Sequence, residues 1–244
     1  MFNTETKLNY TVCAEAKEKV TVIIMCAGSS SRMGDIDKLT VKLDGKELFL
    51  HSVLKFQNNP KISNIVIVTR KENILFYQNK ILEYELTKVT DIVEGGSCRE
   101  ESVKNGLFMI KEPLGYVLIH DGARPFVTDE CIDRVIMGAV KHNACICTVK
   151  SKDTIKVVNE DGMVVSTPNR DALVSVQTPQ GFKTNLLKNS FEKYADKLAS
   201  FTDDASLVEK NGYNIYTVDG DYKNIKITTL EDLKFAEFML SEDK

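Results

Sequence analysis

Phosphate-binding chemistry is first suggested by a small-residue loop near the start of the sequence. The apolar segment Val20 to Cys26 runs into Ala27 to Gly34, which reads A-G-S-S-S-R-M-G, and Lys38 follows shortly. Backbone N–H groups of such a loop can approach phosphate oxygens closely, and Arg32 and Lys38 add positive charge. The spacing fits neither established glycine motif, because Ser30 replaces a dinucleotide-loop glycine and the Gly-Lys-Ser/Thr ending of a P-loop is missing. The loop predicts polyphosphate binding, and the alternative is a serine-rich surface loop.

Two further loops carry groups suited to a nucleotide. In the segment Gly95 to Ser102, two glycines permit backbone conformations that bring N–H and C=O groups against a base or a phosphate. The alternative there is a tight turn with a surface arginine, Arg99. In H-D-G-A-R-P, Asp121 ends an apolar strand and suits Mg²⁺ or a substrate hydroxyl. We expect His120 to form structural hydrogen bonds without a catalytic role, and Arg124 equally suits a salt bridge.

The elements that position these loops alternate between apolar strands and helices, which is typical of an α/β sandwich with a mostly parallel sheet. Strands are expected at Val20–Cys26, Ile65–Thr69, Val89–Val93, Tyr116–Ile119, Ala144–Val149 and Asn214–Val218. Helices are expected at Leu48–Gln57, Glu72–Tyr84, Arg99–Ile110, Asp129–Lys141 with Thr128 as its N-cap, Leu186–Leu198, Ala205–Lys210 and Leu230–Leu240. Each loop described above follows one of the predicted strands.

A β-hairpin is expected at Asp153 to Thr167, where two β-branched runs flank the turn Asn159-Glu160-Asp161-Gly162. A two-stranded ribbon is marginally stable alone, so a second subunit is the economical partner for it. We expect a protruding dimerisation arm at about residues 150–172. It belongs to a single domain of residues 20–244, preceded by a loosely ordered extension, residues 1–19.

Composition excludes several classes of protein. The 244 residues carry 32 Lys and Arg against 35 Asp and Glu, so no overall basic field favours nucleic acid as a partner. No apolar run approaches the roughly 18 residues of a membrane span, and residues 1–19 lack the apolar core of a secretory signal. The six cysteines form no C-x-x-C pair, which argues against a zinc ribbon. We expect reduced cysteines and a cytoplasmic protein without nucleic-acid or membrane partners.

The ordered motifs resemble one enzyme family. These are A-G-x-x-x-R-M-G with Lys38, G-G-x-x-R-x-x-S-V-x-N-G-L, H-D-x-A-R-P-F-V, D-T-I-K, N-R, Q-T-P-Q-x-F, T-D-D-A-S-x-V-E and N-I-K-I-T-T. Together, from about Val20 to Leu240, they look like the 2-C-methyl-D-erythritol 4-phosphate cytidylyltransferases. The resemblance implies a Rossmann-like nucleotidyltransferase fold and a homodimer clasped by the arm. It also implies CTP, a polyol phosphate and Mg²⁺ or another divalent cation as ligands, in non-mevalonate isoprenoid precursor synthesis.

The resemblance also implies roles for individual residues. Arg32, Lys38 and Lys226 match the catalytic cations around the α-phosphorus. Ala27, Gly28, Gly96, Arg99, Ser102, Asp121 and Arg124 match nucleotide-side positions, and Asp121 lies beside the metal, whose ligands are otherwise unknown. Thr154 and Arg170 match arm residues that reach the neighbouring subunit's substrate, and Thr178 and Thr202 match further substrate-side positions.

Two alternatives remain open. A ribitol 5-phosphate cytidylyltransferase resembles this sequence in its glycine loop, D-T pair and Q-T-P-Q motif. A nucleotide-binding regulator without catalysis is the alternative from another class, since the phosphate loop departs from the family pattern at Ser30 and Asp37 and has a short interval before Lys38. Lys42 is the substitute cation if Lys38 is misplaced. No Ser-His-Asp or Cys-His constellation is expected, because an ionised phosphate needs no covalent nucleophile.

Overall fold

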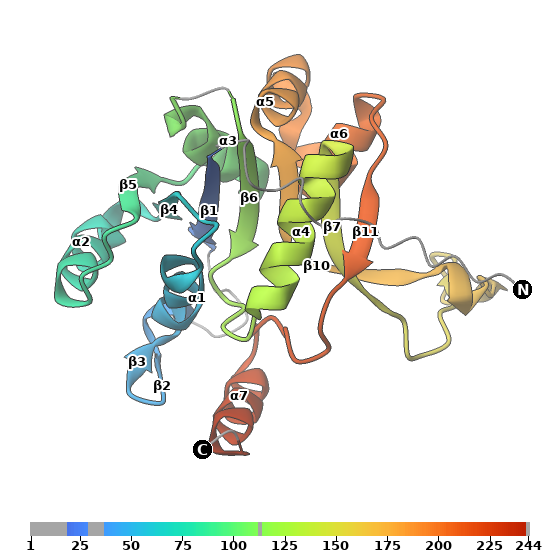
Figure 1. The fold of residues 1–244 in the computed structure, drawn as a ribbon. Helices are drawn as coiled ribbons and strands as arrows, with labels where there is room; N and C mark the ends of the chain where they lie inside the picture. The colour runs from blue at the N-terminus through green and yellow to red at the C-terminus, as the bar shows by residue number, and fades with distance from the viewer. Residues whose placement is uncertain (1–18, 29–36, 112–113, 243–244) are drawn as a thin grey trace, which may run out of the picture.

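The computed structural model describes residues 19–28, 37–111 and 114–242. The predicted extension (residues 1–19, except Lys19) and Arg32 lie outside these ranges. A seven-stranded sheet has the order β11-β7-β10-β6-β1-β4-β5 (Figure 1). Its strands are β1 (Val20–Cys26), β4 (Asn64–Thr69), β5 (Val89–Glu94), β6 (Tyr116–Asp121), β7 (Ala144–Lys150), β10 (Val174–Lys183) and β11 (Tyr216–Asp219). All neighbouring pairs are parallel except those of β10 with β6 and β7, which confirms the predicted mostly parallel α/β sheet.

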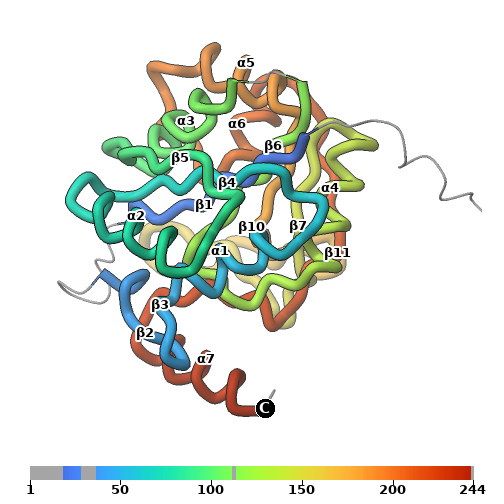
Figure 2. Tube along the Cα trace, turned by 60° about the vertical axis from the view of Figure 1, so that its left-hand side comes forward, coloured from blue at the N-terminus to red at the C-terminus, as the bar shows by residue number. Residues whose placement is uncertain are grey.

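Helices cover both faces of this sheet. One apolar cluster lies against α1 (Leu48–Asn58), α2 (Ile74–Glu83) and α4 (Asp129–His142), and a second lies against α3 (Arg99–Met109), α5 (Thr184–Lys193) and α6 (Asp204–Lys210). Figure 2 shows α3, α5 and α6 on the side of the sheet away from α1. The last helix, α7 (Leu230–Glu242), lies beyond the carboxyl end of β6 (Figure 1). None of the described helices is both long and apolar enough to cross a membrane.

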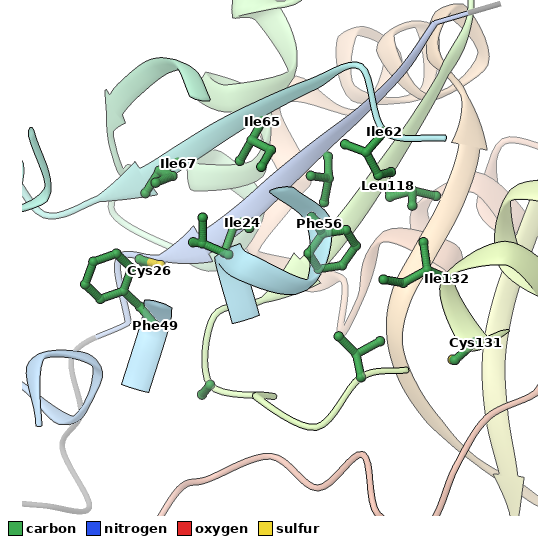
Figure 3. Close-up of a cluster of buried hydrophobic side chains, with 14 of the residues drawn as sticks. Ile24, Cys26, Phe49, Phe56, Ile62, Ile65, Ile67, Leu118, Cys131 and Ile132 are labelled. Atoms are coloured by element: carbon green, nitrogen blue, oxygen red, sulfur yellow. The ribbon is translucent and has the colours of Figure 1, made fainter. Parts of the chain in front are cut away.

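Side chains of the central strands point alternately to the two faces of the sheet and so contribute to both apolar clusters. Ile24 and Cys26 of β1 face α1 (Figure 3), whereas Ile23 belongs to the opposite cluster. Successive strand side chains point to opposite faces, so a strand covered on both sides reads as an uninterrupted apolar run. Phe49 and Phe56 of α1 close the first cluster, and all five side chains are fully buried. This packing fixes the carboxyl end of β1, where the first candidate loop begins.

Most predicted elements are present, with small shifts at their ends. Thr128 caps α4 as expected, since its side chain accepts a hydrogen bond from the Cys131 N–H at 3.2 Å. The helix predicted at Leu186–Leu198 is α5 followed by a separate 3-10 helix, Ala195–Ser200. A small hairpin of β2 (Lys42–Leu43) and β3 (Lys46–Glu47) was not predicted. Nor was β10, whose ten residues lie between β6 and β7.

The predicted arm is a short hairpin that projects from the body of the molecule (Figure 1). Its strands β8 (Val157–Val158) and β9 (Val164–Ser166) pair antiparallel and are exposed. Asn159 closes the turn, because its side chain accepts hydrogen bonds from the N–H groups of Asp161 and Met163 at 3.2 and 2.9 Å. The strands are shorter than predicted, but the hairpin and its Asp-Gly turn are confirmed.

Candidate active site

Two adjacent cavities open near the carboxyl ends of the central strands. The β1 cavity, of about 530 Å³, is lined by the residues after β1 and by the glycine segment. The β10 cavity, of about 510 Å³, is lined by residues of β10 and by the segment before α6. Arg99, Asp121 and Lys226 line both cavities and form what we call the central wall. In parallel sheets, ligands bind at this edge of the strands.

The structure brings most of the sequence-predicted site residues together. The β1 cavity is lined by Ala27, Gly28, Lys38, Gly96 and Ser102. The β10 cavity is lined by Arg124, Thr178 and Thr202, and the three residues of the central wall complete the set. Two arm residues, Thr154 and Arg170, line neither cavity of this chain and are exposed. Lys42, the substitute cation, is exposed in β2 and lines neither cavity either.

The glycine segment is held in shape by its own hydrogen bonds. Ser102 Oγ accepts from the Gly96 N–H at 2.9 Å and donates to the Cys98 carbonyl at 2.9 Å. Gly95 passes so close to the end of β1 that a Cβ atom there would lie 2.5 Å from the Cβ of Ala27. These bonds fix the shape of the glycine segment, and the close approach at position 95 leaves no room for a side chain.

Lys38 is positioned by its neighbour Asp37. One Asp37 carboxylate oxygen accepts the Leu39 N–H at 3.1 Å and so caps the 3-10 helix Lys38–Thr40. The other accepts from Asn73 at 2.6 Å and pairs with Arg70 at 3.1 Å. These bonds anchor the segment that places Lys38 at the β1 cavity.

Lys226 comes from a segment without regular structure that is anchored on both sides. Fully buried Asn224 donates to the Thr178 carbonyl at 2.9 Å, and the Ile227 N–H donates to the Ala123 carbonyl at 2.9 Å. Lys226 Nζ then lies 3.0 Å from an Asp121 carboxylate oxygen. Two long-range anchors thus bring a residue near the end of the chain to the centre of the site.

Asp121 is a buried carboxylate surrounded by cations. Burial alone raises its pKa, but Lys226, Arg99 and Arg124 outweigh burial and hold the pKa of Asp121 well below its usual range. Arg124 Nε lies 3.4 Å from the same oxygen that Lys226 contacts. Asp121 is therefore ionised at neutral pH, and it fixes the positions of two cations at the boundary of the cavities.

His120 is a structural residue, as the sequence predicted. Its Nε2 lies 3.2 Å from the Arg124 carbonyl, which can only accept, so Nε2 carries the proton. Nδ1 then accepts from the Thr178 hydroxyl at 3.1 Å, and Thr178 Oγ1 in turn accepts the Asp121 N–H at 3.1 Å. This buried chain of bonds locks the loop that carries Asp121 and Arg124 onto β10.

Comparison with known proteins decides the family. A model of the 2-C-methyl-D-erythritol 4-phosphate cytidylyltransferases matches residues 20–242. The chain belongs to this family. A Clostridium novyi protein named as such an enzyme is 45% identical over 228 residues, which cover 93% of this chain and 98% of that protein. A Clostridium tetani protein of the same name is 44% identical over 220 residues, which cover 90% and 89%.

Solved structures agree with this membership. The 4-diphosphocytidyl-2C-methyl-D-erythritol synthase of Anaerococcus prevotii matches with a TM-score of 0.82 and 34% identity, covering 92% of this chain and 96% of that one. The Francisella tularensis 2-C-methyl-D-erythritol 4-phosphate cytidylyltransferase matches with a TM-score of 0.76 and 32% identity, covering 91% and 99%. The chain is therefore a nucleotidyltransferase of this cytidylyltransferase family, and the predicted fold class and family are confirmed.

The side chains at this cytidylyltransferase site suit a magnesium ion that is held by a single carboxylate. Within the described residues, no three His, Cys, Asp or Glu side chains gather as a cage for a metal. Asp121 is a single ionised carboxylate at the boundary of the cavities. Mg²⁺ is commonly held by one or two carboxylates together with substrate phosphates. The donor set therefore suits an ion carried mainly by the nucleotide, with Asp121 as the protein ligand.

Three supporting residues of the family site were not predicted from the sequence. Gln177 bonds both backbone groups of Asp221, through its Nε2 at 2.8 Å and its Oε1 at 3.3 Å. Asn224 holds Lys226 in place, and Asp204 pairs with Arg99 at 2.7 Å. All three lie in or beside quoted motifs, Q-T-P-Q, N-I-K-I-T-T and T-D-D-A-S. Their presence there was the available signal, but their partners are distant in the sequence.

The buried His120 predicts a pH dependence of stability. Burial lowers its pKa to about 4, below the ~6.5 of an exposed histidine. The unfolded chain therefore takes up a proton that the folded protein refuses, so the free energy of unfolding should fall as the pH drops from about 6.5 toward 4. Asp121 and the other carboxylates with lowered pKa add a loss that sets in only below about pH 5, so His120 dominates the upper part of this window.

Urea unfolding at several pH values checks this expectation, with His120→Gln as the matched control. The control should show a shallower loss of stability between about pH 6.5 and 4. Equal slopes for the two proteins would contradict the role assigned to burial of the ring.

Proposed function

We propose that the protein transfers the cytidylyl group of CTP to 2-C-methyl-D-erythritol 4-phosphate and releases pyrophosphate, for isoprenoid precursor synthesis. CTP occupies the β1 cavity, and the polyol phosphate occupies the β10 cavity. One observation carries this assignment: two cavities of similar size meet at a wall of two cations and one carboxylate. A transfer between two phosphates needs such a meeting point.

The chemistry requires positioning and charge rather than a nucleophilic side chain. The phosphate of the polyol attacks the α-phosphorus, the P–O bond to pyrophosphate breaks, and negative charge grows on the equatorial and leaving oxygens. Lys226 lines both cavities and Lys38 lines the β1 cavity, which supports assigning both to the stabilisation of that charge. We assign Arg32 the same role from its motif, although it lies outside the described residues. Retention of these cations argues against an inactive regulator.

A bound magnesium ion would neutralise part of the negative charge of the triphosphate. Asp121 would hold the ion together with the nucleotide, as its single ionised carboxylate allows. The Lys226 contact keeps this carboxylate turned toward the boundary of the cavities. The nucleotide is bound from the loops on either side by Ala27, Gly28, Gly96, Arg99 and Ser102. The polyol phosphate is bound by Thr178, Thr202 and Arg124; we reassign Arg124 from the nucleotide because it lines only the β10 cavity.

The active form in this proposal is a homodimer. The arm exposes apolar residues, among them Met163 at 63% and Val165 at 60% of their surface, which a second subunit would cover. Arg170 donates to the Lys152 carbonyl at 3.2 Å and, within the described residues, forms no ion pair with Asp171. We therefore assign Arg170 and Thr154 to the polyol phosphate of the neighbouring subunit. The cytoplasm is the proposed location, since the described cysteines are free thiols.

A direct comparison of acceptors tests the proposed function. We expect pyrophosphate release from CTP with Mg²⁺ and 2-C-methyl-D-erythritol 4-phosphate, and much less with ribitol 5-phosphate. Preference for ribitol 5-phosphate would contradict the proposed acceptor, because the β10 cavity would then fit an unbranched polyol better than the methyl-branched one. Tight CTP binding without pyrophosphate release from either mixture would instead support a regulator.

A further inference from the structure

Two helices from opposite sides of the site begin at one buried ion pair. Arg99 is the first residue of α3 and lines both cavities. Asp204 is the first residue of α6, directly after the segment that lines the β10 cavity. Arg99 Nη2 donates to Asp204 Oδ2 at 2.7 Å, across 105 residues of sequence. The pair is therefore a direct link between the loops that bind the two substrates.

Stability alone does not explain this pair. Asp204 is fully buried, and the Arg99 side chain is 29% exposed. Burial disfavours the charge on Arg99, but Asp204 and Asp121 outweigh burial and raise the pKa of Arg99 above its usual value. Among the described residues, Arg99 Nη1 and Asp204 Oδ1 are buried with no hydrogen-bond partner, so the pair is only half satisfied. Apolar residues of similar size often stabilise such a position equally well or better.

We propose that Asp204 is a positioning residue for the transfer and acts through Arg99. By tying α6 to the glycine segment, it sets the separation between the acceptor phosphate and the α-phosphorus of the nucleotide. This inference rests on the proposed function, in which the reacting atoms must approach to about 3–3.5 Å. The other residues that line each cavity remain when the Arg99–Asp204 pair is broken. Loss of this pair should therefore lower kcat more than it raises the KM for either substrate.

The test measures kcat and both KM values in Asp204→Asn, which keeps the shape of the side chain and removes its charge. We expect kcat to fall by about 10-fold or more, as for a misplacement of reacting groups, with smaller changes in KM. In an Arg99→Met background the same change should slow the enzyme no further, because Asp204 acts through Arg99. Asp133→Asn is the matched control, since Asp133 pairs with Lys61 at 2.6 Å on the surface and lines neither cavity.

Two results would overturn the proposal. One is that folded Asp204→Asn has the kcat and KM values of the wild type. The other is that Asp204→Asn lowers kcat as much in the Arg99→Met enzyme as it does in the wild type. If Asp204→Asn fails to fold, Arg99→Lys tests the same contact with its charge kept, and an unchanged kcat there would equally overturn the idea. The wild-type rate is measured first and tests the proposed function by itself, whereas the ratio of variant to wild type tests the pair.

Discussion

Lys226→Ala should lower kcat by about 100-fold or more, by analogy with the removal of one preorganised electrostatic contact. Lys226 Nζ lies 3.0 Å from Asp121 at the boundary of the cavities, where charge grows in the transition state. The KM for CTP should change far less, because ground-state binding is shared with backbone N–H groups and with Lys38. The loss should therefore appear as turnover rather than affinity.

Steady-state kinetics with CTP and the methylerythritol phosphate provide the measurement. Lys61→Ala is the control, because Lys61 forms an exposed ion pair, lines neither cavity and should keep the wild-type rate. Thermal melting of both variants separates a kinetic loss from unfolding, since Asp121 loses a counter-ion in Lys226→Ala. Near-normal turnover in folded Lys226→Ala would remove this residue from the mechanism.

Mixing two inactive variants should restore activity if the arm serves the neighbouring subunit. Lys226→Ala disables the central wall, and Arg170→Ala disables the arm. Each site of a dimer would use Lys226 of one subunit and Arg170 of the other. In a mixed dimer, one site therefore carries both substitutions and the other site carries neither. Random mixing should therefore return about a quarter of the wild-type activity, as expected for a symmetric dimer with shared sites.

The mixed sample is prepared by joint unfolding and refolding, and each variant refolded alone is the control. Arg170→Lys adds a finer test, because a guanidinium binds two phosphate oxygens at once and an ammonium does not. That change should raise the KM for the polyol phosphate and leave the KM for CTP nearly unchanged. Mixed dimers that stay inactive would exclude a site shared across the dimer.

The sequence predicted those parts of the fold whose signals are local. β1 and β6 are buried on both faces and read as apolar β-branched runs, so their positions were predictable. β10 contains Pro179 and Gly181, which are poor strand residues, and its first three residues are exposed. Its place in the sheet follows from pairing with β6 and β7, which no local pattern reports.

The same distinction applies to the site. Asp121 was predictable because it ends a strand, and Gly96 because it lies in a short glycine motif. Asp204 and Asn224 act through partners 105 and 46 residues away, and only the three-dimensional structure brings those partners together. Asp37 departs from the family pattern, yet its side chain caps the helix that carries Lys38, so the departure has a local structural use.

The position of β10 also constrains the order in which the chain can fold during synthesis. β6 and β7 follow one another in the sequence but do not pair, because β10 lies between them and bonds to both. A ribosome-bound chain that ends before residue 174 therefore leaves unpaired the β6 edge and the β7 edge that β10 joins, and such edges favour association with other chains. Completion of β10 closes both edges at once. These two edges therefore stay open until β10, which follows the arm in the sequence, has been made.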